Sequence, residues 1–454
     1  MPCSPDQTIE RLTMKNTRFF CVAVAALALG LSTLRAGHTS PSATPTFSKD
    51  VAPIIFKNCA GCHRPDDIAP MSLLSYEEAR PWAKAIREQV SLGNMPPWHA
   101  TQSRGTFSND RRLTDQEKAT LISWADGGAP KGDPKDLPPA PKFASGWEIG
   151  TPDAVISMTK EFNVPESGTI DYQFFSAPTN FTEDKWVQAI EVRPGARSVV
   201  HHILVFCSEP GARRAAGFSQ VGPRASGRRN EPGRDQSLNH AGIPGSLIAT
   251  TAPGTNAMTF APGTALKIKA GSTFSFQIHY TSTGTAAKDR SSVGVIFAKQ
   301  PPKQEIRNSA FVNPMFVIPP GASDTAVESA IEFNEDAHIW ALFPHTHLRG
   351  KSWAYKLVFP DGREEVVLSV PKYDFNWQTY YTFSKPIAIP KGTRLEAVAH
   401  YDNSTANPWN PDPKIAVRWG PQTWEEMQYS GITYSIDEPR QENSAPPSRD
   451  GNKL

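Results

Sequence analysis

The sequence predicts a multidomain protein in which a small all-α domain precedes two all-β sandwich domains. Within residues 47–132, apolar side chains recur at helical spacing. From Trp147 onward, short runs rich in β-branched and aromatic residues alternate with Gly, Pro and Asn turns, a pattern typical of β-sandwiches. A weaker break at residues 299–306 divides this β region in two, and a chain of 454 residues is long enough for roughly two to four domains.

The composition of the intervening segments sets the predicted boundaries. A proline-rich stretch separates the helical region from the β region, and an arginine-, glycine- and proline-rich insert, residues 208–245, interrupts the first sandwich as a long loop. The resulting divisions are a leader at 1–36, the helical domain at 47–132, a linker at 133–146, the N-terminal sandwich at 147–302, the C-terminal sandwich at 303–435 and a disordered tail at 436–454.

Three helices are expected in the helical domain. The first covers residues 47–59, and the second is restarted near its first turn by Pro81. The third has the clearest limits, because Thr114 and Glu117 form a capping box at its start and Gly127 follows its end.

The leader has the layout of a secretory signal peptide. Lys15 and Arg18 form its basic n-region, residues 19–31 form a short apolar run, and small residues allow cleavage after Ala36. The apolar run is too short to span a bilayer comfortably. We therefore expect an exported mature chain with no stable membrane insertion.

Charge and cysteine content restrict the possible partners and disulfides of the chain. The 47 Lys and Arg residues nearly balance the 45 Asp and Glu residues, which argues against nucleic acid as a partner. Of five cysteines, two lie in the leader region and two in the motif described next. Only Cys207 remains, so the mature chain is expected to have no internal disulfide, and Cys207 is interpreted as a buried strand residue.

Cys59, Cys62 and His63 form a C-x-x-C-H motif, the signature of covalent haem c attachment. The two thiols bind the haem vinyl groups and His63 is the proximal iron ligand. Behind an export signal and inside a small helical domain, this motif predicts a cytochrome c domain with one haem. It also indicates a periplasmic or secreted bacterial protein.

The distal haem ligand is predicted to be Met95, which lies in the rigid segment "GNMPPWHA". Met71 is an alternative that is more consistent with packing, and His99 would give a bis-histidine haem. Three tryptophans are expected to form walls of the haem pocket: Trp82, Trp98 and Trp124.

Histidines gather in three segments of the β region, and a methionine follows near the end. The candidate metal ligands are His201, His202, His279, His345, His347 and Met427. In a strand, His345 and His347 point to the same face, whereas the adjacent His201 and His202 converge only at a bulge or strand end. Imidazole suits copper, and an added thioether favours copper, especially Cu(I), over zinc.

The ordered motifs H-H, Q-x-H-Y, H-x-H-L-x-G and E-M resemble those of the copper type II, ascorbate-dependent monooxygenase family over residues 147–435. The resemblance implies two jelly-roll-like sandwiches, each with one copper, and a solvent-filled cleft between them. It assigns an electron-transfer copper to His201, His202 and His279. It assigns the copper at which oxygen binds and hydroxylation occurs to His345, His347 and Met427.

The sequence departs from this family at the substrate-binding positions. Phe343 stands where the peptide-amidating members have an arginine for the substrate carboxylate, and Tyr429 and Gly431 replace polar residues after the methionine. A peptide carboxylate is therefore not the expected substrate, and an apolar or aromatic molecule is favoured. Three other histidines are interpreted as structural: His240, His338 and His400.

Together these features predict an exported oxidoreductase that hydroxylates a small organic substrate with O2. Electrons would pass from a periplasmic donor to haem, then to the three-histidine copper, and then to the copper with the methionine ligand. The alternative is a multi-centre electron-transfer or copper-handling protein without monooxygenase activity. An open metal position facing a substrate-sized cleft would favour the enzyme, and a fully shielded site would favour the alternative.

Overall fold

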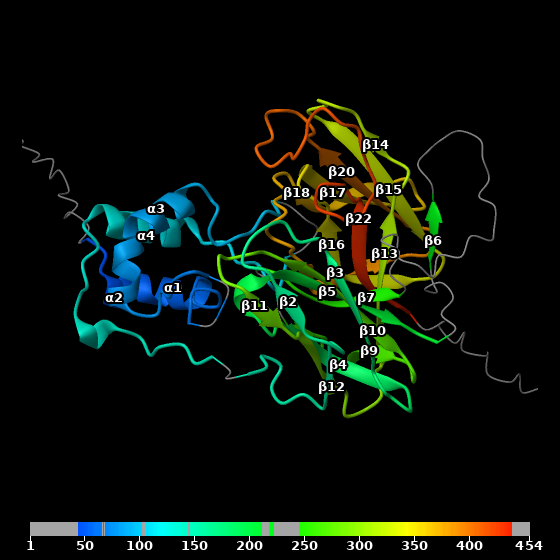
Figure 1. Cartoon of the computed structure of the whole chain (residues 1–454), viewed down its shortest axis with the longest axis horizontal. Coiled ribbons are helices and arrows are strands. Elements are labelled where there is room, and N and C mark those ends of the chain that lie inside the picture. Colours follow the sequence, from blue (N-terminus) through cyan, green and yellow to red (C-terminus); the bar gives the residue numbers. More distant parts are fainter. Residues whose placement is uncertain are drawn as a thin grey trace, which may run out of the picture. The chain divides into compact units, whose positions relative to one another are not determined.

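A computed structural model describes the chain between residues 44 and 437 (Figure 1). The described ranges are 44–65, 67, 69–101, 106–143, 146–210, 218–221, 245–253, 255 and 257–437. The predicted signal peptide, most of the arginine-rich insert with His240, and residues 438–454 of the predicted tail lie outside them. Among the described residues, no helix combines the length and apolar character that a membrane crossing requires.

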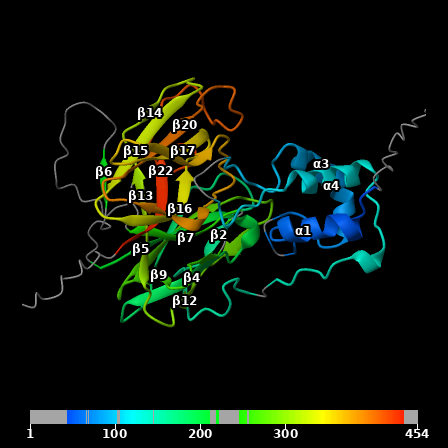
Figure 2. The same ribbon diagram turned by 180° about the vertical axis from the view of Figure 1, so that it is seen from behind.

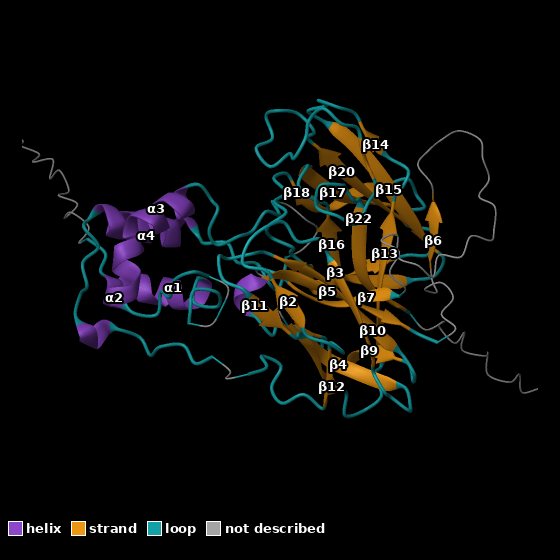
Figure 3. Cartoon of the chain, in the orientation of Figure 1, coloured by secondary structure: helices purple, strands orange, loops and turns teal. Residues whose placement is uncertain are grey.

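The predicted helices are present between Phe47 and Asp126 (Figure 3). Thr114 caps α4 and forms the predicted capping box with Glu117, and Pro81 lies in the short 3-10 segment that joins two helices. The helical elements are a π-helix at Phe47–Val51, α1 at Ala52–Asn58, α2 at Tyr76–Ala79, a 3-10 helix at Arg80–Trp82, α3 at Ala83–Ser91, α4 at Asp115–Asp126 and a 3-10 helix at Pro134–Asp136.

Strands make up most of the rest of the described chain, as expected. The first group comprises β1 Ala154–Ser157, β2 Phe162–Val164, β3 Gln173–Pro178, β4 Lys185–Arg193, β5 Val200–Ser208, β7 Ser246–Thr251, β8 Met258–Thr259, β9 Thr264–Ile268, β10 Thr273–Tyr280, β11 Ala287–Asp289 and β12 Ser292–Phe297, with a 3-10 turn at Arg197–Val199. The second comprises β13 Gln304–Val312, β14 Val317–Ile318, β15 Thr325–Phe333, β16 Ala337–His345, β17 Gly350–Val358, β18 Glu364–Val370, β19 Tyr381–Ile389, β20 Arg394–Tyr401, β21 Val417–Arg418 and β22 Tyr429–Ile436. One further strand, β6 Phe218–Val221, falls within the insert and pairs with β15.

The largest sheet runs through both halves of the β region. Its strand order is β1-β12-β4-β9-β13-β22-β16-β19, with β8 attached to β4. The halves join where β9 pairs in parallel with β13. Strands β13, β22 and β16 lie side by side in both views (Figures 1 and 2). The two expected sandwiches therefore share one continuous sheet.

Each half of the large sheet has a smaller sheet of its own and a separate apolar core. The four-stranded sheet β3-β10-β5-β7 belongs to the first half, and the sheet β18-β17-β20-β15-β6 belongs to the second. These cores form because side chains alternate between the two faces of a strand. In β20, every second residue is buried, and the residues between them are only partly covered. Representative core residues are Ile203, Phe274, Phe276 and Val293 in the first half and Ile331, Tyr355, Leu395 and Tyr434 in the second.

The three tryptophans predicted to line a haem pocket have different positions. Trp124 is fully buried in the core of the helical unit, whereas Trp82 is 41% exposed. Trp98 belongs to the C-terminal β core, where its ring centroid lies 5.5 Å from that of Phe107 and 5.1 Å from that of Tyr381. The prediction for Trp98 was therefore wrong, because these aromatic rings bury it in the β region.

Candidate metal sites

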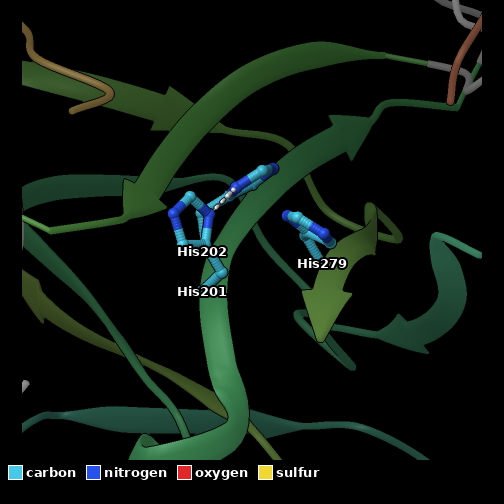
Figure 4. Close-up of side chains that lie close together, drawn as sticks. All are labelled: His201, His202 and His279. Carbon is cyan, nitrogen blue, oxygen red and sulfur yellow. Dashed lines mark hydrogen bonds between the residues drawn. The ribbon is translucent and has the colours of Figure 1, made fainter. Parts of the chain in front are cut away.

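Three histidines from two neighbouring strands converge in the first β half (Figure 4). In the pairing of β5 with β10, His202 lies opposite His279, and the next residue of β10, Tyr280, lies opposite Val200. His201 therefore has no partner in β10 and forms a β-bulge in β5. This bulge turns His201 to the side where His202 and His279 lie. The predicted convergence of the adjacent histidines at a bulge is confirmed.

The geometry of this three-histidine site suits a metal ion. One ring nitrogen from each histidine lies within 4.8 Å of the others. The Nδ1 atoms of His201 and His202 are 3.0 Å apart. Nδ1 of His279 is buried and has no hydrogen-bond partner among the described residues. Since metal–imidazole bonds are about 2.0–2.1 Å long, only a small inward movement would bring all three nitrogens onto one ion.

Burial keeps these imidazoles in the neutral form that binds metals. It lowers the pKa of His201 to about 4 and that of His279 to about 3. The pKa of His202 is also held well below its usual value, first by burial and then by neighbouring histidines. At neutral pH each residue therefore offers an unprotonated nitrogen without first releasing a proton.

The second group lies in the C-terminal half. His345 is the last residue of β16, and His347 follows the strand end, so only one of the two lies within a strand as predicted. Their ring centroids are 5.3 Å apart. Because β22 pairs with β16 and matches Tyr429 to His345, Met427 precedes β22 at the same end of this pair. The side chains of all three candidate ligands are buried.

Hydrogen bonds fix the tautomers of both histidines in this second group. Nε2 of Gln378 donates to the carbonyl of Phe375 at 2.6 Å, so its Oε1 faces Nδ1 of His345 at 2.7 Å as an acceptor. Nδ1 of His347 donates to the carbonyl of Glu425 at 3.2 Å. Each Nδ1 therefore carries the proton, and each Nε2 lone pair is left for a metal.

The buried carboxyl group of Glu426 accepts hydrogen bonds from three backbone N–H groups at this site. Its oxygens accept backbone N–H bonds from His347 at 2.8 Å, Arg349 at 2.6 Å and Met427 at 3.3 Å. Burial raises the pKa of Glu426 to about 8, while the amide donors and the Arg349 charge act in the opposite direction. Residue 350 has to be glycine, because a Cβ atom at this position would collide with the side chain of Thr346.

Two aromatic rings occupy the region between the histidine groups. The centroid of Tyr172 lies 5.1 Å from that of His279 and 6.4 Å from that of His347. The centroid of Phe375 lies 5.8 Å from that of His201 and 6.0 Å from that of His347. Tyr172 and Phe375 are themselves only 6% and 8% exposed. Both rings therefore pack against the two histidine groups, and the solvent-filled cleft stays a prediction.

An apolar layer adjoins His345. Phe343 is fully buried and stacks on Tyr380 with a centroid distance of 4.4 Å. Its ring is also parallel to that of His345 at 6.0 Å, and Tyr429 approaches His345 from another side at 6.2 Å. A side chain on Gly431 would contact Phe343 at 2.9 Å, which explains the glycine four residues after Met427.

The C-x-x-C-H motif lies at the end of α1, where Cys59 is the C-terminal cap. Cys59 and Cys62 are free thiols, and the peptide N–H of His63 bonds to the carbonyl of Cys59 at 3.0 Å. Burial lowers the pKa of His63, and its Nδ1 is buried without a hydrogen-bond partner among the described residues. Free thiols beside a neutral imidazole are compatible with covalent haem attachment.

The remaining ligand candidates are distributed as follows. Met71 packs against the core of the helical unit, as expected for a structural residue. Burial lowers the pKa of His99, and the nearby charges of Asp374 and Lys372 act on it in opposite directions. Met95 is partly buried and remains the predicted distal ligand.

The other assignments concern residues outside the two histidine groups. His338 pairs with Asp437 at 2.9 Å and His400 with Asp324 at 2.8 Å, which agrees with structural roles. Cys207 is buried in β5, as predicted, and burial raises its pKa to about 12.

Sequence reasoning missed four residues of the sites: Tyr172, Phe375, Gln378 and Glu426. Only Glu426 had a signal, because it belongs to the E-M motif.

Comparisons with known proteins bear on the C-terminal half. Residues 308–439 match the family model described as copper type II ascorbate-dependent monooxygenase, C-terminal domain. A search of curated proteins finds no match. Among solved structures, the major capsid protein P2 of bacteriophage PM2 has 10% identity and a TM-score of 0.27, covering 63% of this chain and 98% of that one. A putative secreted protein from Eubacterium rectale has 9% identity and a TM-score of 0.18, and the match covers 58% of this chain and 69% of that one. The family match, which includes His345, His347 and Met427, supports a copper monooxygenase-like function.

Proposed function

We propose that this protein is an exported copper- and haem c-containing monooxygenase that hydroxylates a small organic substrate with O2. The observation that carries the proposal is the presence of two groups of candidate ligands that differ in composition, one partly buried and one buried. One consists of three imidazoles, and the other contains two imidazoles and Met427 within the segment that matches the copper monooxygenase family.

The protein side chains account for how two coppers would be held. Burial keeps the histidines neutral, and Gln378 and the Glu425 carbonyl orient His345 and His347 so that Nε2 is available. The thioether of Met427 favours Cu(I) at the second site, which suits a centre that must react with O2 in its reduced state. Copper, when bound, supplies one-electron redox chemistry and oxygen activation. No side-chain acid or base is needed beside it.

The helical unit is proposed to carry one covalent haem c. Cys59 and Cys62 would attach it, with His63 and Met95 as axial ligands. Haem c supplies electrons one at a time, and the proposed order is periplasmic donor, haem, three-histidine copper and then the Met427 copper. Fusion in one chain supports this role because it gives the electron donor a high effective concentration at the β region. A bacterial periplasmic or secreted location follows from the same proposal.

The substrate is proposed to be small and apolar or aromatic. The layer beside His345 includes Phe343, Tyr380 and Tyr429, and the buried Arg349, two residues after His347, has an Nη2 without a hydrogen-bond partner among the described residues. Its side chain donates to Asn403 at 2.8 Å and to the carbonyl of Trp424 at 2.8 Å. The apolar layer is therefore the feature that favours a small apolar or aromatic substrate over a peptide carboxylate.

The proposal is tested by loading the full chain with copper and haem, reducing it without oxygen, and adding 18O2 with a panel of small organic substrates. Incorporation of one 18O atom into a product is expected from the wild-type protein and not from Met427→Ile. If no substrate is hydroxylated while the protein binds two coppers and re-oxidises its haem, the monooxygenase assignment is wrong.

The alternative is a multi-centre electron-transfer or copper-handling protein. The burial of the second histidine group favours it, because His345 and His347 are at most 3% exposed. Such a protein would consume reducing equivalents or transfer copper without forming a hydroxylated product. The same experiment separates the two functions, since a protein without monooxygenase activity puts no 18O into an organic product.

A further inference from the structure

One loop contacts both histidine groups. It comprises residues 371–380, joins β18 to β19 and is called the bridging loop. On the side of the three-histidine site, Phe375 is the contacting residue. The distances from its ring centroid are 5.8 Å to His201, 6.0 Å to His202 and 6.1 Å to His279.

The same loop supports the second group through two other residues. Gln378 is fully buried and accepts a hydrogen bond from Nδ1 of His345. The Tyr373 hydroxyl donates to the carbonyl of Thr346 at 3.0 Å and accepts from its N–H at 3.2 Å. Thr346 separates His345 from His347, so the loop holds both the imidazole of His345 and the backbone between the two histidines.

Contacts from other segments hold the bridging loop in place. Thr255 of the first β half donates to the carbonyl of Gln378 at 3.0 Å. Asn109, beyond α3 in the chain, donates to the carbonyl of Tyr380 at 2.6 Å. Inside the loop, the Gln378 side chain donates to the carbonyl of Phe375. This hydrogen bond links Phe375, which contacts the three-histidine site, to Gln378, which orients His345.

We propose that the bridging loop positions both predicted copper sites together: Gln378 sets the orientation and tautomer of His345, and Phe375 excludes water from the space beside the three-histidine site. This inference rests on the proposed function, because it takes both groups to bind copper. A glutamine that acts on a ligand without touching the metal affects metal affinity through the imidazole. A ring packed on all three histidines controls access without donating a ligand.

Gln378 is tested by measuring the Cu(I) affinity of each site by competition with a chromogenic chelator. Gln378→Leu removes the acceptor, and we expect the affinity of the second site to fall by about 10–100-fold, with the first site unchanged. Gln378→Glu keeps an acceptor for Nδ1 but cannot donate to the Phe375 carbonyl. It is therefore expected to recover most of the second-site affinity if orientation of His345 matters, and to be as damaging as leucine if only packing matters.

Gln428→Leu is the matched control for loss of a buried amide in the same β half. Its side chain bonds to Ser329 and Ser430 and not to a histidine. Lower stability with unchanged second-site affinity is expected. If Gln378→Leu gives the same result as this control, Gln378 is not a positioning residue.

Phe375 is tested with azide, which binds Cu(II) and gives a charge-transfer band. Phe375→Leu should bind azide faster and more tightly than wild type at the first site, because a smaller side chain admits water and anions. Phe375→Ala should show a larger effect if it folds. Phe359→Leu, a buried phenylalanine elsewhere in the same β core, is the control and should behave as wild type. Equal azide binding in Phe375→Leu and the control would overturn the role of Phe375.

The outcomes separate this inference from the function on which it rests. If the wild-type protein takes up no copper at the second site, both the proposed function and the inference fail. If wild type binds two coppers and hydroxylates a substrate, but the loop variants match their controls, only the inference fails.

Discussion

Replacement of Glu426 by alanine should be among the most damaging single changes in the β region. The carboxyl group is fully buried and accepts two short backbone N–H bonds, from His347 and Arg349, and a longer one from Met427. Alanine leaves these donors without an acceptor, at a cost of about 1–3 kcal/mol for each buried group.

Taking the two short bonds at about 1–3 kcal/mol each, we expect the unfolding free energy to decrease by about 2–6 kcal/mol. That is a large part of the roughly 5–15 kcal/mol that stabilises a typical domain. The metal-free protein is unfolded in urea and followed by far-UV circular dichroism, and copper at the second site is counted separately. Glu426→Gln keeps one acceptor oxygen and should lose less stability.

Glu364→Ala is the control for loss of a carboxylate, because Glu364 forms an exposed pair with Lys356 and should contribute at most about 1 kcal/mol. A decrease below about 1 kcal/mol for Glu426→Ala, similar to this control, would refute the reasoning. So would a variant that retains full copper binding at the second site after a large loss of stability, because the carboxyl group would then hold the fold and not the ligands.

Four further predictions follow from the sites. Met427→Ile should abolish hydroxylation and weaken copper binding at the second site only, as shown by metal analysis and by the spectra of the remaining copper. Met95→Ala should remove the near-infrared sulfur-to-iron band of the oxidised haem and lower its potential; the same loss in Met71→Ala, with Met95→Ala unaffected, would reassign the ligand. In rapid mixing, His201→Ala should leave a pre-reduced haem intact but unable to pass on its electron, whereas equal haem oxidation in copper-free protein would exclude the relay. Cys207, whose pKa burial raises to about 12, should resist alkylation at pH 8 in the native protein and react once the chain is unfolded.

Local sequence patterns determined much of what the structure contains. The capping box at Thr114 and Glu117 defines the start of α4, because both groups that satisfy the helix N-terminus lie within four residues of each other. The adjacent His201 and His202 required a bulge if both were to face one ion, and the register between β5 and β10 provides it. The candidate ligands could be named from sequence because metal chemistry restricts residue type and because the order of the motifs resembles that of the copper type II monooxygenase family.

The arrangement around those ligands was decided only by the tertiary structure. Gln378 and Phe375 lie some thirty residues after His345 in a segment with no recognisable motif, and the strand pairing of β16 with β19 brings their loop back to the histidines. Trp98 was expected to line a haem pocket, yet long-range contacts with Phe107 and Tyr381 bury it in the β core. The parallel pairing of β9 with β13 likewise merges two expected sandwiches into a shared sheet. Residue type restricts the metal chemistry locally, whereas packing between residues far apart in the chain decides which side chains orient the ligands and exclude water.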